Sequence, residues 1–185
     1  MSDTESDIEI SNDNVNDQLE GYMRARREQL KQEFKNQELK FQGFGKLDEI
    51  DETVFLANVT AHDYVIAHFY QPEFITCQAM NVILEEMAQQ HLESKFIKID
   101  APGAGFFVNK LKIKTLPTII IFKKGKILKK FIGFEEFGMD QPSYDLVLKG
   151  LGTYGALTLS LQEEKQFKKS GGTLFGYADE EGSDW

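Results

Sequence analysis

Three strand-like segments constrain the fold of this chain more than any other feature. The first, residues 64–70, has the length and composition of one buried strand. It leads through a short turn into a helical pattern that contains Cys77. About forty residues later, Pro117 precedes a second apolar run at 118–123. Lys124-Gly125 joins this run to a third segment, 126–132, in which apolar residues alternate with lysines. A two-residue link ending in Gly between such runs predicts a β-hairpin.

The remaining segments complete an alternating pattern. We expect a strand at 95–100, and Thr76 is a candidate cap for the helix that carries Cys77. The other expected helices are 51–58, 103–110 and 141–151, the last with Pro142 in its first turn. An order of βαβα, then a hairpin and a helix, predicts an α/β fold with a mixed central sheet and helices on both faces.

Composition and charge exclude several classes of function. The 185 residues carry a net charge of -9, which disfavours binding to nucleic acid or to anionic lipid. A single cysteine excludes an intrachain disulfide, and three scattered histidines lack metal-ligand spacing. We therefore expect no metal or cofactor and a protein of the reducing cytosol, with nuclear entry left open.

Four segments follow from changes in composition along the chain. Residues 1–17 are acidic and polar, which predicts a disordered tail or, alternatively, an acidic arm that binds a partner. Residues 18–43 form a charged amphipathic helix that ends at Gly43, and residues 44–155 form the compact domain. Residues 156–185 lose the core pattern and end in an acidic cluster, which predicts a second flexible tail.

The predicted helix 18–43 carries a narrow apolar stripe. At about 100° per residue its apolar positions lie within roughly 60° of one another. A stripe this narrow suits docking along a single surface, which is either the chain's own compact domain or a partner protein. The residues of the stripe are Leu19, Met23, Leu30, Phe34 and Phe41.

The compact domain resembles a thioredoxin. A strand, an active-site turn, a helix and then a strand that follows Pro117 stand in the order of that family, whose equivalent proline is cis. A thioredoxin would carry Cys-x-x-Cys at positions 74 to 77, and this chain has Phe74-Ile75-Thr76-Cys77. The resemblance implies a thioredoxin-like fold in which Phe74 stands in the place of the attacking cysteine.

Further motifs are similar to those of the phosducin-like branch. They are the charged helix before the domain, His68-Phe69-Tyr70 before the single-cysteine turn, the segment 91–99 and the Gly-Phe element at 133–138. The resemblance implies a regulator of the cytosolic chaperonin CCT/TRiC in actin and tubulin folding. Phosducin itself binds G-protein βγ subunits through a long N-terminal helical domain, and the shorter segment here makes βγ a less favoured partner.

The residues of the turn allow two interpretations. Disulfide reduction needs an attacking thiolate and a resolving thiol, and Phe74 can be neither. Cys77 is then a buried inert thiol or, alternatively, the centre of a monothiol redox protein. The resemblance also places His68 where thioredoxin has a buried acid and Val82 where it has a helix-kinking proline.

The basic hairpin leaves a second alternative open. Its lysines are either solvated strand and turn residues or a surface for an acidic partner. They are Lys123, Lys124, Lys126, Lys129 and Lys130. From all of these features the sequence predicts a non-enzymatic binding protein with Pro117 as an architectural residue.

Overall fold

The computed structural model describes residues 12–137 and 143–158. The chain divides after Phe41 into two units, the first being residues 1–41 and the second 42–185. Most of both predicted acidic tails, at 1–11 and 159–185, lies outside the described residues, as does Pro142. Among the described residues no helix combines the length and the apolar character needed to span a bilayer.

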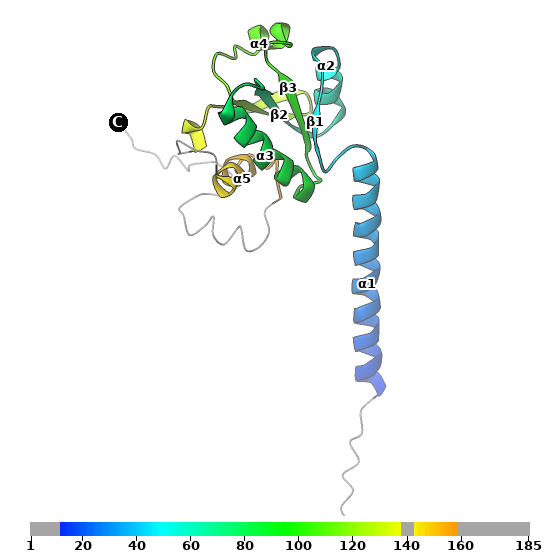
Figure 1. The fold of residues 1–185 in the computed structure, drawn as a ribbon. Helices are drawn as coiled ribbons and strands as arrows, with labels where there is room; N and C mark the ends of the chain where they lie inside the picture. The colour runs from blue at the N-terminus through cyan, green and yellow to red at the C-terminus, as the bar shows by residue number, and fades with distance from the viewer. Residues whose placement is uncertain (1–11, 138–142, 159–185) are drawn as a thin grey trace, which may run out of the picture. The chain divides into compact units, whose positions relative to one another are not determined.

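The first unit contains one long helix, α1 (Asn12–Phe41), drawn in blue in Figure 1. Thirty residues at a rise of 1.5 Å per residue give a length of about 45 Å. The helix begins at Asn12, inside the segment that the sequence assigns to the acidic tail, so the predicted start at residue 18 was wrong. Asn and Asp are common where helices begin, and the sequence of the first turn is rich in both.

The second unit is built on a five-stranded sheet in the order β1-β3-β2-β4-β5. Strand β3 pairs in parallel with β1 and β2, whereas β4 pairs antiparallel with β2 and β5. The strands are β1 (Leu47–Glu49), β2 (Tyr64–Tyr70), β3 (Lys95–Asp100), β4 (Thr118–Lys123) and β5 (Lys126–Ile132). The mixed sheet is confirmed, and four of its strands have the bounds that the sequence predicts.

Helices cover both faces of this sheet, which confirms the predicted layers (Figure 1). On one face α3 (Ile75–Gln90) and α5 (Tyr144–Gly152) pack on Ile66 and Ile121 of the sheet. On the other face α2 (Glu52–Ala61) and α4 (Gly105–Lys110) pack on Val65 and Ile120. Neighbouring residues of one strand enter opposite cores because side chains alternate across a sheet.

The link between β4 and β5 is the predicted tight hairpin. Lys124 and Gly125 have φ values of 49° and 78°, and left-handed conformations at both link residues match the twist of the paired strands. A Cβ atom on Gly125 would also lie 3.2 Å from Thr60 Cγ2 at the end of α2. Glycine therefore meets both a conformational and a packing requirement at this turn.

The compact domain extends slightly past the predicted boundary at residue 155. Ala156 and Leu157 are buried in the core. The Ser94 hydroxyl donates to the Ala156 carbonyl, and the Thr158 amide donates to Glu93 Oε1 at 2.5 Å. The segment after α5 is thus tied to the loop before β3, a long-range contact that composition alone does not reveal.

Candidate functional site

The turn that precedes α3 presents hydrocarbon where a thioredoxin presents its attacking sulfur. Phe74 occupies the cap position of α3, because its carbonyl accepts the first helical hydrogen bond from the Gln78 amide at 3.0 Å. Phe74 is 43% exposed, and Ile75 is 80% exposed. Thr76 lies within the first turn of the helix, so the prediction that it caps the helix was wrong.

Cys77 lies behind this turn and is fully buried. Burial raises the pKa of its thiol, and hydrogen bonds with the Gln71 backbone and the Thr76 side chain offset only part of that effect. The thiolate is the reactive form of cysteine. A buried, protonated thiol is therefore a poor nucleophile. The geometry disfavours the alternative that Cys77 is the centre of a monothiol redox protein.

His68 lies in β2 and is fully buried. Its Nδ1 atom is 2.9 Å from Asn81 Oδ1 on α3, while its Nε2 atom has no hydrogen-bond partner among the described residues. Burial lowers the pKa of His68 to about 4, against a smaller opposing effect of the Asn81 hydrogen bond. Because the Asn81 oxygen can only accept, the neutral ring carries its proton on Nδ1. His68 is thus an uncharged core residue at neutral pH.

Pro117 lies at the same end of the sheet as the Phe74 turn. The Leu116–Pro117 peptide bond is cis, and Thr118 follows at the start of β4, where it pairs with Phe69 near the end of β2. The Pro117 carbonyl accepts from the Gly133 amide at 2.8 Å, which closes the far end of the β4–β5 hairpin. The sheet register therefore brings Pro117 and the turn together, as the sequence order implies.

An ionic network on the β1 side of the sheet was missed by sequence reasoning. Lys95 is 3% exposed, pairs with Asp48 and donates to the Gly43 carbonyl. Burial alone would raise the pKa of Asp48, but Lys46 and Lys95 outweigh it and hold that pKa below its ordinary value. A second pair joins Lys98 to Glu49, which also accepts from the Tyr70 hydroxyl at 2.9 Å; the distance between Lys98 Nζ and Glu49 Oε2 is 3.0 Å.

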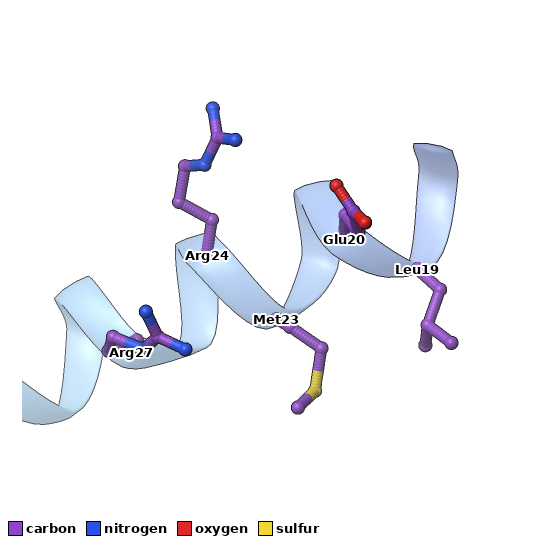
Figure 2. Close-up of a pocket in the computed structure, with 5 residues that line it drawn as sticks. All are labelled: Leu19, Glu20, Met23, Arg24 and Arg27. Atoms are coloured by element: carbon purple, nitrogen blue, oxygen red, sulfur yellow. The ribbon is translucent and has the colours of Figure 1, made fainter. Parts of the chain in front are cut away.

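The apolar stripe of α1 is exposed along the helix. The exposed fractions run from 37% at Leu30 to 94% at Phe41. Figure 2 shows Leu19 and Met23 projecting from the same side of the helix, away from Arg24. Tyr22 is 67% exposed next to the stripe and was not included in the sequence prediction.

The remaining polar side chains of α1 form local pairs. Glu28 and Lys31 lie 2.8 Å apart, and Arg26 donates to Gln29 at 3.0 Å. Exposed pairs of this kind contribute little to stability. Within 12–137 and 143–158, no group of three or more His, Cys, Asp or Glu side chains could hold a metal ion.

Comparisons with known proteins agree with this geometry. The Thioredoxin family model matches residues 46–139. Thioredoxin f from spinach chloroplast has a TM-score of 0.54 and 24% sequence identity over 64% of this chain and 93% of its own. A thioredoxin from Halobacterium salinarum has a TM-score of 0.53 and 19% identity over 63% of this chain and 95% of its own. At these identities the likeness shows the fold alone.

Curated relatives include a phosducin-like protein and other thioredoxin domain-containing proteins. Thioredoxin domain-containing protein PLP3A of Arabidopsis thaliana is 44% identical over 59% of this chain and 48% of its own length. Phosducin-like protein 3 of Dictyostelium discoideum is 42% identical over 66% of each chain. Thioredoxin domain-containing protein 9 of Homo sapiens is 31% identical over 72% of this chain and 60% of its own.

The chain spans about half to two thirds of the length of these relatives. Their names confirm the resemblance that the single-cysteine turn and the preceding helix indicate. The match of the family model and the thioredoxin-like sheet show that this chain belongs to the thioredoxin family, with phosducin-like proteins among its relatives.

Proposed function

We propose that this chain is a non-enzymatic regulator of the cytosolic chaperonin CCT/TRiC in the folding of actin and tubulin. Its similarity to phosducin-like proteins supports the choice of partner. The observation that carries the binding role is the exposed apolar stripe of α1, which offers a line of hydrophobic side chains from Leu19 to Phe41. Such a line suits the groove of a larger protein.

The geometry of the turn supports the non-enzymatic part of the proposal. Phe74 has no sulfur to attack a disulfide, and Cys77 is buried with a raised pKa. A thiol–disulfide reaction would need an accessible thiolate and a second thiol to resolve the mixed disulfide. The chain has one cysteine in all. Binding is therefore the function that this arrangement supports best.

Refolding of denatured actin by purified chaperonin and ATP tests the function directly. Addition of the full chain is expected to change the yield of folded actin in a dose-dependent way. The Cys77→Ala variant should have the same effect, because the thiol takes no part. An unchanged yield at a several-fold excess of chain over chaperonin would refute the regulatory role, and loss of the effect in Cys77→Ala would refute the thiol-independent mechanism.

A further inference from the structure

Charge is strongly segregated along this chain. Residues 101–134 contain eight lysines and no aspartate or glutamate, although the whole chain has a net charge of -9. The lysines are Lys110, Lys112, Lys114, Lys123, Lys124, Lys126, Lys129 and Lys130. A basic segment of this length in an acidic protein is a local feature that the docking role of α1 does not explain.

Three of these lysines lie on β5, and one hydrogen bond brings the loop that carries two more beside the strand. Lys130 on β5 donates from Nζ to the Leu111 carbonyl at 2.5 Å, which joins the hairpin to the loop between α4 and β4. That loop carries Lys112 and Lys114, both exposed, and Lys126 is exposed at the start of β5. The Lys130–Leu111 bond therefore places the loop that carries Lys112 and Lys114 beside β5, whereas Lys126 lies at the start of that strand.

Strand β5 lies at the end of the sheet and pairs only with β4. In the part of the chain that the structure describes, no backbone hydrogen bond joins its outer edge to another element. Three aliphatic side chains are exposed on it: Ile127 at 50%, Leu128 at 41% and Ile132 at 44%. Lysines alone would protect an edge from unwanted pairing, but exposed aliphatic side chains do not serve that purpose.

We propose that the β5 edge binds an extended acidic peptide segment of a partner protein by adding it as a sixth strand. The partner backbone would pair with the outer edge of β5. Its carboxylates would lie near Lys126 at the start of β5 and near Lys112 and Lys114 in the loop beside it, and apolar side chains between them would cover Ile127 and Ile132. Exposed aliphatic groups and a free strand edge match a polypeptide better than a nucleic acid, whose phosphates would use the lysines alone.

Titration of the full chain with a labelled peptide of alternating Glu and Val, followed by fluorescence anisotropy, tests this proposal. We expect saturable binding that weakens as salt rises. A peptide of alternating Lys and Val should not bind. The Glu-Val peptide with N-methyl groups on one edge should also fail to bind, because it keeps its charge but cannot pair as a strand.

Charge reversal gives a second readout. The double substitution Lys114→Glu and Lys126→Glu should weaken peptide binding about tenfold, since two exposed attractions become repulsions. Lys35→Glu with Lys40→Glu on α1 is the matched control, because it changes the net charge equally at another place. The control should bind the peptide about as well as the unchanged protein, apart from a small general effect of net charge.

Three outcomes would overturn the proposal. Equal binding of the N-methylated peptide would show that only ionic attraction is involved. A uridine oligonucleotide that binds as tightly as the peptide would identify a polyanion site instead. Sedimentation velocity that shows a dimer abolished by the Lys114 and Lys126 substitutions would show that a second copy of the chain occupies the edge.

Discussion

Removal of the α1 stripe should weaken chaperonin binding strongly without unfolding the helix. The perturbation is the triple substitution Met23→Ala, Leu30→Ala and Phe34→Ala. Alanine has the highest helix propensity of the ordinary residues, so helix content should be unchanged. Any loss of affinity then reports the side chains themselves.

The exposed fractions set the expected magnitude. Met23 is 56% exposed, Leu30 37% and Phe34 68%. Complete burial of such a side chain is worth ~2 kcal/mol, so covering only these exposed portions gives about 3 kcal/mol for the three. The alanine methyl groups retain part of this, which leaves ~2 kcal/mol, or about a 30-fold loss of affinity.

The assay is a titration of labelled full chain with purified chaperonin, followed by anisotropy. A matched triple on the opposite side of α1, Glu28→Ala, Gln32→Ala and Lys35→Ala, leaves net charge unchanged and should bind within about twofold of the unchanged protein. Circular dichroism checks the helix in both variants. A stripe variant that binds within threefold of the unchanged protein, or a control that loses as much affinity, would refute the docking argument.

Three further predictions concern the compact domain. Alkylation of Cys77 in the folded protein should be at least about 100-fold slower than in urea at the same pH, because the reagent needs an opening that costs ~3 kcal/mol; reaction at the rate of an exposed thiol would contradict its burial. His68 binds a proton more weakly in the folded state, where its pKa is about 4, than in the unfolded state, where it is about 6.5. Its contribution to the free energy of unfolding should therefore be fully present above about pH 6.5. That free energy should fall by up to ~3 kcal/mol as the pH drops to about 4. Urea unfolding between pH 7.5 and 4.5 checks this, and His68→Gln should show a shallower fall; an equal slope would assign the loss to other groups. Gly150→Ala should destabilise the domain by ~1–2 kcal/mol despite its better helix propensity, because the new Cβ would lie 2.7 Å from Phe137 Cε1; a rise in the urea midpoint would show that the Phe137 ring moves away freely.

Local sequence patterns predict the strands well because each strand carries its own signal. β2 and β4 are short apolar runs whose ends are marked by turn residues, and their bounds at 64–70 and 118–123 match the structure. The same holds for the hairpin, whose Lys124-Gly125 link has left-handed backbone angles at both residues. Patterns of this kind depend on neighbours in sequence and can be read without tertiary information.

Strand β1 had no such signal. Its three residues, Leu47–Glu49, show no run of apolar side chains, and the strand exists through its pairing with β3 nearly fifty residues away. The burial of Lys95 depends on the same pairing, because Asp48 on β1 supplies its counterion. A lysine normally indicates exposure, so this ionic pair could be found only once the two strands were placed side by side.

In the candidate site, too, some features follow from local sequence and others depend on contacts between distant segments. Phe74 and Cys77 are adjacent to a predicted strand and helix, so their places could be inferred from motif order. The contact between His68 and Asn81 joins β2 to α3, and no spacing in the sequence indicates it. Thr76 was mistaken for the cap because its hydroxyl is typical of that position, whereas the cap is Phe74, two residues earlier, and it makes no side-chain cap hydrogen bond.

Co-migration of the full chain with purified chaperonin on a sizing column, at low and at physiological salt, tests the central claim most directly. The account predicts that the chain elutes with the chaperonin at both salt concentrations, because the α1 stripe supplies apolar contacts that salt does not screen. Elution of the chain at its own position under both conditions would contradict the proposed role.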